Sequence, residues 1–258
     1  MKKQEKRLLT LLEILKDEKA ASTKELSQHL KVTEMTVRRD LGILADKNQV
    51  RIIHGGAIYT AREQRNEYEY YFFFQEETRY KEHKARIGKK ASSLIEESDT
   101  IIIDGGSTAE CVARHIPKDV EITILCYSLN IANIVCRNNR WKKIVSGGYY
   151  NDDSLMFESP KGVELIKSMR ASKAFISATG VNSTLGLTCK NISEVETKKA
   201  VIASSDTKIL IVDSSKFGQV HIAHFADLDD FNIIITDGGI PQEYRDLINE
   251  REIELHIV

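Results

Sequence analysis

Residues 22–41 read STKELSQHLKVTEMTVRRDL, and this stretch decides the fold of the N-terminal part of the chain. Ser22 and Glu25 have the spacing of a capping box, in which the hydroxyl accepts a hydrogen bond from a free backbone amide and the carboxylate reaches back to the cap. A short helix is therefore expected to begin there. The residues KV at 31–32 are expected to form the turn that ends it.

A second helix is predicted after this turn, over Thr33–Lys47, with the Thr33 hydroxyl as its N-cap. Its apolar residues recur at helical spacing and form one face: Val37, Leu41 and Leu44. The opposite face carries short polar groups and cations: Met35, Thr36, Arg38 and Arg39. Two short helices joined by a tight turn, with a polar and basic face on the second, indicate a helix-turn-helix arrangement.

Elements on both sides complete this N-terminal unit. A preceding amphipathic helix is predicted over Lys3–Lys16, because leucines recur there at helical spacing: Leu8, Leu11, Leu12 and Leu15. Downstream, Val50–Ile53 and His54–Ile58 are predicted to form two short strands around a Gly55-Gly56 turn. A hairpin beside the second helix is typical of a wing, so residues 1–60 are predicted to be a winged helix-turn-helix domain.

The side chains of this unit suit double-stranded DNA. Arg38 and Arg39 can neutralise phosphates, or one can donate two hydrogen bonds to guanine, which discriminates against other bases by about 1–3 kcal/mol. Two adjacent arginines alone are more often a solvated helix face, but the neighbouring hairpin favours DNA binding. The residues predicted to contact DNA are Thr23, Thr33, Met35, Thr36, Arg38, Arg39, Arg51, His54, Gly55 and Gly56.

Length and charge set the broad class. The chain has 258 residues, 41% of them apolar and 29% charged, which is enough for one large or two ordinary domains and excludes a disordered or collagen-like chain. The net charge of −1 conceals an asymmetry. Residues 1–60 hold 12 basic and 8 acidic side chains, whereas residues 61–258 hold 25 and 30. A small basic unit on a larger acidic one fits a DNA-binding head on an acidic body.

The composition also suggests where the protein works. No run approaches 18 apolar residues, and charges interrupt the apolar residues near the start, so we expect no membrane-spanning helix and no signal peptide. The four cysteines form no C-x-x-C pair: Cys111, Cys126, Cys136 and Cys189. We therefore expect reduced thiols in a cytoplasmic protein, with no metal site and no cofactor.

Residues 61–83 are predicted to connect the head to the body. Tyr68–Phe74 holds six of the 18 aromatic residues, which is too apolar for a flexible linker. One interpretation is a platform on which single-stranded nucleic acid stacks. The favoured interpretation is a segment that packs on the body or on a partner subunit, because nearby carboxylates would repel phosphates: Glu67, Glu69, Glu76 and Glu77.

Residues 84–258 alternate between helical and strand patterns. A helix is expected around Ile87–Ile95, and others over Asn130–Arg137, Pro160–Met169 and Ser193–Ala203. Short apolar runs predict seven strands: Thr100–Ile103, Glu121–Leu125, Lys143–Val145, Lys173–Ser177, Lys208–Val212, Asn232–Thr236 and Glu252–Val258. Ser193 and Glu196 have capping-box spacing, and Pro241 suits the first turn of a last helix. The fold class is therefore α/β, a mostly parallel sheet covered on both faces.

Ligands of such sheets bind where strand ends meet helix starts, and three such corners carry suitable residues. Asp104-Gly105-Gly106-Ser107-Thr108 offers backbone amides, hydroxyls and a helix N-terminus to an anion, and Asp104 could bind sugar hydroxyls. A plain tight turn is an equally good interpretation of this segment. Ser128 marks the second corner, and Lys216 the third, where an ammonium group suits a phosphate.

These segments together resemble the DeoR family of bacterial transcriptional regulators. KVTEMTVRRDL at 31–41 and IHGGA at 53–57 are similar to the family's helix-turn-helix and wing motifs, with Thr33 for the usual Ser and Ile52 for the usual Arg. DGGST at 104–108, Gly147-Gly148, GLT at 186–188 and DSSKFG at 213–218 resemble motifs of its effector domain. The sequence departs from the family at CYS (126–128), SP (159–160) and ATG (178–180).

The resemblance implies a body like ribose-5-phosphate isomerase and coenzyme A transferases, and a phosphorylated sugar as effector. The effector-binding residues expected are Asp104, Gly105, Gly106, Ser107, Thr108, Ser128, Gly147, Gly148 and Lys216. We expect a repressor of a carbohydrate-metabolism operon that acts as a homodimer or homotetramer, because one head reads too few base pairs. The alternatives are an isomerase of sugar phosphates that uses Asp237, and a DNA-binding protein whose body senses no ligand.

Overall fold

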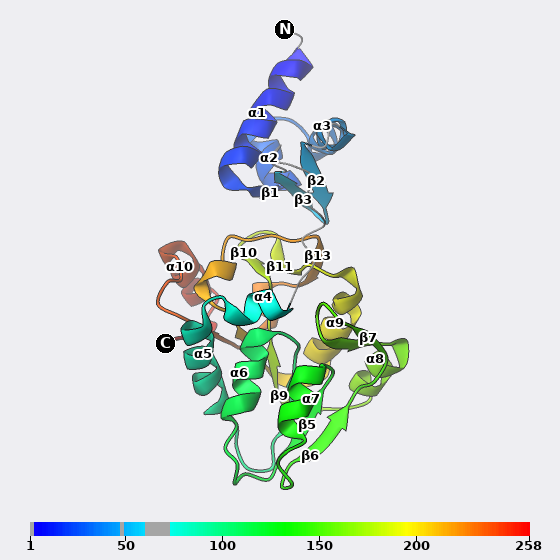
Figure 1. Ribbon diagram of the computed structural model, residues 1–258. Helices are drawn as coiled ribbons and strands as arrows, with labels where there is room; N and C mark the ends of the chain where they lie inside the picture. Colours follow the sequence, from blue (N-terminus) through cyan, green and yellow to red (C-terminus); the bar gives the residue numbers. More distant parts are fainter. Residues whose placement is uncertain (1–2, 47–48, 60–72) are drawn as a thin grey trace.

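The computed structural model describes residues 3–46, 49–59 and 73–258, which form a small N-terminal head and a larger body (Figure 1). The elements of the head are α1 (Lys3–Glu18), β1 (Ala20–Ser22), α2 (Thr23–Leu30), α3 (Glu34–Asp46), β2 (Val50–Ile53) and β3 (Gly56–Tyr59). The aromatic residues predicted within 68–72 lie outside the described residues, as does Lys47 at the predicted end of the second helix.

The helices of the head form for the reasons that the sequence indicated. The Ser22 and Glu25 capping box is present at the start of α2, and Lys31 closes that helix in the left-handed conformation. Apolar residues of α1, α2 and α3 meet in one core: Leu11, Leu15, Leu26, Val37, Leu41 and Leu44 are all buried. The helix-turn-helix prediction is therefore confirmed.

The hairpin of the head differs in detail from its prediction. Ile53 pairs with Gly56, so the two-residue turn is His54-Gly55 and not Gly55-Gly56. Gly55 supplies the positive φ of that turn, 79°, and Gly56 belongs to β3. A strand that the sequence did not predict, β1, pairs with β3 and makes a three-stranded sheet. A Cβ on Gly56 would lie 2.3 Å from the Ala21 carbonyl oxygen, so this close pairing requires glycine.

The body is built on a seven-stranded parallel sheet, and each predicted apolar run forms one of its strands. In chain order these are β4 (Thr100–Ile103), β5 (Thr123–Cys126), β6 (Lys142–Val145), β9 (Ala171–Ile176), β12 (Ser205–Ile211), β14 (Ile233–Thr236) and β15 (Glu254–Ile257). Their order across the sheet is β15-β14-β12-β9-β4-β5-β6. The α/β prediction is confirmed, although several strands begin or end a few residues away from the predicted bounds.

Helices cover both faces of this sheet (Figure 1). One face is covered by α5 (Lys81–Ser92), α6 (Ser107–His115) and α7 (Leu129–Val135), and the other by α8 (Pro160–Lys167), α9 (Val195–Ala203) and α10 (Gln242–Glu250). Side chains alternate along each strand, so Ile101 and Ile103 pack in one core while Ile102 packs in the other. This two-sided burial explains why the central strands are largely apolar, whereas the edge strands β6 and β15 carry charged residues as well.

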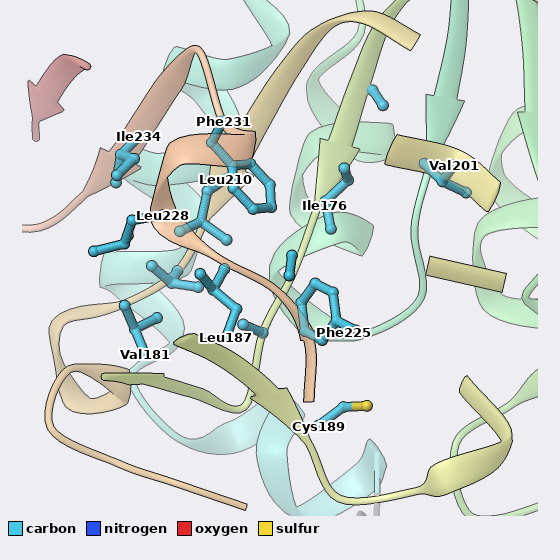
Figure 2. Close-up of a cluster of buried hydrophobic side chains, with 14 of the residues drawn as sticks. Ile176, Val181, Leu187, Cys189, Val201, Leu210, Phe225, Leu228, Phe231 and Ile234 are labelled. Carbon is cyan, nitrogen blue, oxygen red and sulfur yellow. The ribbon is translucent and has the colours of Figure 1, made fainter. Parts of the chain in front are cut away.

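A smaller antiparallel sheet packs on the core that contains Ile102. Its strands are β10 (Gly180–Asn182), β11 (Gly186–Cys189) and β13 (Ala223–Ala226), in the order β10-β11-β13. Figure 2 shows how Leu187 and Phe225 from these strands meet Ile176 and Leu210 of the large sheet. A further hairpin joins β7 (Tyr149–Asn151) and β8 (Met156–Glu158). These strands were not predicted, because runs of three or four residues give too weak a pattern.

Two helix starts were predicted wrongly. Ser193 does not cap α9, because a 3-10 helix over Ile192–Glu194 precedes it and the Ser193 hydroxyl instead donates to Glu158. Pro241 is the N-cap of α10 and not part of its first turn.

Part of the predicted connector packs on the body. A short helix, α4 (Phe73–Thr78), contacts α6, the Phe73 side chain is buried, and its amide donates to the Asp153 carbonyl oxygen at 2.8 Å. The following helix, α5, begins at Lys81, before the predicted domain start at residue 84. Packing on the body is thus observed for Phe73, while the residues before it are not described. No helix within the described ranges is long and apolar enough to cross a membrane.

Candidate effector pocket and nucleic-acid interface

The exposed face of α3 presents the side chains expected to contact DNA. Met35 is 74% exposed, and Arg38 and Arg39 are both exposed. Arg38 Nη2 lies 3.7 Å from Glu34 Oε2, and both side chains are well exposed, so this ion pair is weak and leaves the guanidinium free to bind phosphate or a base. Thr33 and Thr36 lie at the start of the helix with their hydroxyl oxygens 3.0 Å apart.

Two other predicted DNA contacts have structural roles instead. The Thr23 side chain is buried, and its hydroxyl lies 3.2 Å from both Glu34 Oε2 and the Gly55 carbonyl oxygen. Gly56 is buried in the three-stranded sheet against Ala21. The Thr23 hydroxyl is thus turned inward and Gly56 is enclosed in the sheet, so neither residue is included in the DNA-binding surface proposed below.

The head core is also held by a buried ion pair between α1 and α3. Arg7 donates through Nε and Nη2 to the Asp40 carboxylate, with Nη2 3.0 Å from Oδ1, and Asp40 is fully buried. Asp40 follows the two arginines of the predicted DNA-binding face, but it points inward. This two-pronged pair fixes the position of α3 on α1.

The wing also meets the body. Ala20, Ile53 and Ile58 of the head pack in one apolar cluster with Leu185 and Val220 of the body. Leu185 lies in the turn between β10 and β11, so the predicted DNA-binding hairpin contacts the small sheet directly.

A cavity lies at the carboxyl ends of β4, β9 and β12, the usual ligand edge of a parallel sheet. The predicted Gly105–Thr108 turn lines it, with α6 beginning at Ser107, and Lys216 faces it from beyond β12. Two further lysines line it as well, Lys84 of α5 and Lys198 of α9. Three ammonium groups, backbone amides and hydroxyls therefore converge on one small space.

The other predicted effector-binding residues lie elsewhere. Ser128 is buried at the N-cap of α7. Gly147 and Gly148 lie between β6 and β7, where the Gly147 carbonyl oxygen accepts a hydrogen bond from Ser159 at the start of α8. Ser128, Gly147 and Gly148 are therefore not among the residues that line this cavity.

Asp104 belongs to a buried network beneath the cavity. Its carboxylate accepts hydrogen bonds from the Tyr127 hydroxyl, from the Ser177 amide and hydroxyl at 2.8 and 2.9 Å, and from Lys198. Asp104 is fully buried, so its oxygens are committed to the protein and not to sugar hydroxyls. The network instead positions Lys198 and the strand ends around the cavity.

Lys198 and Glu194 form the charged wall of the cavity. Burial would lower the pKa of Lys198, but the negative charges of Asp104 and Glu194 raise it above its usual value. Burial also raises the pKa of Glu194, to about 7. The positive charge of Lys198 partly offsets this rise, and the negative charge of Asp104 adds to it. Asn191 donates to Glu194 at 2.7 Å and holds the side chain in place.

The raised pKa of Glu194 predicts a pH-dependent stability. Between its ordinary pKa of 4.5 and about 7, the folded chain keeps a proton that the unfolded chain has lost. The stabilisation by this proton is complete below 4.5 and disappears as the pH rises through 7. Relative to Glu194→Gln, the wild type should lose roughly 1–3 kcal/mol between pH 5 and pH 8. Urea unfolding at several pH values measures this difference, and a constant difference would contradict the assignment.

The cations on the opposite side of the cavity meet one carboxylate. Glu76 Oε2 lies 2.8 Å from Lys216 Nζ and 3.9 Å from Lys84 Nζ, and Lys84 donates to the Glu76 carbonyl oxygen at 2.6 Å. Burial lowers the pKa of Lys84, and Lys216 adds to this, while Asp213 and Glu76 partly offset it. Burial alone would raise the pKa of Glu76, but Lys216, Lys84 and Arg79 together lower it, so the carboxylate is charged.

Four residues that line the cavity were not predicted from the sequence: Glu76, Lys84, Glu194 and Lys198. Each lies within or beside a helix, where a charged residue is normally solvated, so the local pattern gives no signal. Only the crossing of strands and helices far apart in the chain brings them together. The helical apolar spacing that predicted α5 does place Lys84 one turn before Ile87, on the buried side of the helix. This spacing is the one sequence feature that indicates a buried Lys84.

The carboxylate considered for enzymatic proton transfer has a structural role. Asp237 accepts from the Ser214 and Gly239 amides at 2.7 and 3.0 Å and lies 2.9 Å from His83 Nδ1. The Gly239 bond closes the turn after β14, and the Ser214 bond ties that turn to the segment after β12. Within the described ranges, no group of three or more His, Cys, Asp or Glu side chains could hold a metal ion.

Comparison with known families assigns both parts of the chain. Residues 7–63 match the DeoR-like helix-turn-helix domain, and residues 79–238 match the DeoR C terminal sensor domain. The chain belongs to the DeoR family. It is therefore a DNA-binding transcriptional regulator and not an enzyme, and the isomerase alternative is excluded.

Similar proteins match over nearly the whole chain. The uncharacterized HTH-type transcriptional regulator YulB of Bacillus subtilis is 31% identical over 248 residues, which cover 96% of this chain and 94% of that protein. The deoxyribose operon repressor of Escherichia coli K12 is 29% identical and covers 98% of both. The lactose phosphotransferase system repressor of Staphylococcus epidermidis is 31% identical, covering 97% of this chain and 96% of that one.

Solved structures match the body at low identity. Ribose 5-phosphate isomerase A of Methanocaldococcus jannaschii is 16% identical, covering 53% of this chain and 54% of that one with a TM-score of 0.40. The eIF2B delta subunit of Chaetomium thermophilum is 14% identical, covering 56% and 52% with a TM-score of 0.42.

Proposed function

We propose that this DeoR-family regulator is a cytoplasmic repressor of a carbohydrate operon and that a phosphorylated sugar bound in the body controls its binding to operator DNA. The observation that carries the proposal is the convergence of Lys84, Lys198 and Lys216 on the Gly105–Thr108 turn at the start of α6. Lysines, backbone amides and a helix N-terminus are the groups that bind phosphate in proteins. The names of the two similar repressors add support, since one acts on a deoxyribose operon and one on a lactose phosphotransferase system.

The DNA-binding surface in this proposal is the exposed face of α3 with the wing beside it. Its residues are Thr33, Met35, Thr36, Arg38, Arg39, Arg51, His54 and Gly55. A homodimer or homotetramer would place two such heads on half-sites separated by whole turns of the duplex. The effector acts by binding one arrangement of the body more tightly than another. The contact between the wing and the β10–β11 turn offers a path for the change, because β11 also carries Cys189 at the cavity.

The experiment that tests the proposal is an electrophoretic mobility shift of the full chain on its own upstream DNA, at one fixed salt concentration. It is repeated with a panel of sugar phosphates. We expect a specific shift that one of them reverses. A shift that is indifferent to every phosphate would support a regulator whose body senses another ligand or none.

Arg38→Ala is expected to weaken operator binding by about 1–3 kcal/mol and to reduce the salt dependence of binding if Arg38 contacts a phosphate. The same mobility-shift titration measures both quantities. Lys24→Ala removes an exposed lysine from α2, outside the proposed surface, and serves as the matched control. Unchanged affinity in Arg38→Ala would show that α3 does not read the operator with this face.

Lys216→Ala is expected to leave operator binding intact and to abolish the response to the effector, because the phosphate loses its best-placed ammonium group. The readout is the concentration of sugar phosphate that half-reverses the mobility shift. A normal response would remove Lys216 from the effector site.

A further inference from the structure

The cavity already contains an anion that belongs to the chain itself. Glu76 projects from α4 into the space between Lys84 and Lys216, and only 7% of the residue is exposed. Its Oε2 atom is 2.8 Å from Lys216 Nζ, the distance of a charge-assisted hydrogen bond. Arg79 Nη1 lies 3.2 Å from the other carboxylate oxygen, Oε1. An external anion that binds these lysines must compete with this carboxylate.

The size of the cavity leads to the same conclusion. Its volume is about 30 Å³, enough for about two water molecules. A phosphorylated sugar is several times larger than this enclosed space, so the lining must move before it can hold the whole ligand. The lining consists of strand ends and long helices on most sides, and of the six-residue α4 on one.

The position of α4 depends on its contacts with the rest of the body. A helix of six residues is not stable alone, so its position depends on the groups that anchor it. Among the described residues, these groups include the ion pairs of Glu76, the Lys84 hydrogen bond to the Glu76 carbonyl oxygen, and the buried Phe73 with its amide bond to Asp153. Loss of the Glu76 side-chain contacts would remove the ion pairs that tie α4 to Lys216 and Lys84.

We infer that Glu76 is a built-in competitor for the effector, and that the effector's phosphate displaces this carboxylate from Lys84 and Lys216 and moves α4 off the cavity. The inference rests on the proposed function, since it takes the cavity to be the effector site. In the described chain, α4 is also the first element of the body after the head, so its displacement occurs at the junction of the two parts.

The competition selects for a class of ligand. A ligand carboxylate that displaces Glu76 replaces one singly charged group by another, so it gains little binding free energy. A phosphate monoester carries a charge of about −1.5 to −2 at pH 7 and three acceptor oxygens, so it can satisfy both lysines better than Glu76 does. The site therefore favours phosphate monoesters over sugar acids.

The test is isothermal titration of the full chain with inorganic phosphate and with glucose 6-phosphate, ribose 5-phosphate and glucuronate. Glu76→Gln keeps the size of the side chain and removes its charge, and it should bind the phosphate ligands at least about tenfold more tightly than the wild type. Glu77→Gln makes the same charge change one residue along α4 and should bind as the wild type does. Glucuronate should bind the wild type far more weakly than glucose 6-phosphate.

The outcomes separate this inference from the proposed function. Equal phosphate affinity in the wild type and Glu76→Gln, with binding lost in Lys216→Ala, would overturn the competition and leave the effector site standing. No binding of any phosphate to either protein would overturn both. Hydrogen exchange gives a second measurement on the wild type alone: saturating phosphate ligand should speed exchange in residues 73–80, and unchanged exchange there would contradict displacement of α4.

Discussion

Lys198→Met is expected to lower the free energy of unfolding of the body by about 3–5 kcal/mol, because it leaves a buried carboxylate without its counter-charge. Lys198 and Asp104 are both almost fully buried, and their ion pair joins α9 to the end of β4. Methionine fills a similar volume but cannot donate to Asp104. Urea unfolding followed by tryptophan fluorescence measures the loss, since Trp141 is the only tryptophan of the chain and is buried in the body.

Two further variants show whether the unpaired charge is the cause. Lys199→Met changes the exposed neighbour on α9 and should alter stability by no more than about 0.5 kcal/mol. The double variant Asp104→Asn with Lys198→Met removes both charges and should recover much of the loss. If the double variant is as unstable as Lys198→Met alone, the loss comes from packing and not from the carboxylate.

Asp104 also shows where sequence reasoning reaches its limit. A carboxylate at a strand end before a glycine-rich turn suggested a ligand for sugar hydroxyls, and the turn itself does line the cavity. The sequence could not reveal that Lys198, 94 residues later, would take up the carboxylate. Strand-end position is a local property, whereas the partner of a buried charge is decided by the packing of distant elements.

The same distinction explains which parts of the fold were predictable. The strands of the large sheet were predicted because burial on both faces gives the central ones short apolar runs, and the edge strands β6 and β15 keep some apolar residues beside their charged ones. The strands of the small sheets are three or four residues long, and their residues GVN and YYN carry no period that separates them from turns. The helix-turn-helix was predicted from spacing and capping, which are also local. The cavity lysines depend on tertiary placement and were missed, apart from Lys216 at a strand end.

Arg7→Met is expected to lower the stability of the head by about 2–4 kcal/mol. Asp40 is fully buried on α3, and the Arg7 guanidinium is its ion-pair partner in the described structure. Arg7 is 21% exposed, so water can reach the vacated site in part, which places the expected loss below that for Lys198. Because the head lacks tryptophan, hydrogen exchange in α3 measures this loss.

The effect on operator binding distinguishes a residue that holds α3 in place from one that contacts the DNA. Arg7→Met should weaken the mobility shift because α3 loses its fixed position, and exchange in α3 should rise in parallel. Arg38→Ala should weaken the shift while exchange in α3 stays at the wild-type rate, since Arg38 is exposed. Adding Asp40→Asn to Arg7→Met removes the buried charge and should restore part of both stability and affinity. If Arg7→Met weakened operator binding without faster exchange, Arg7 would instead be a DNA contact.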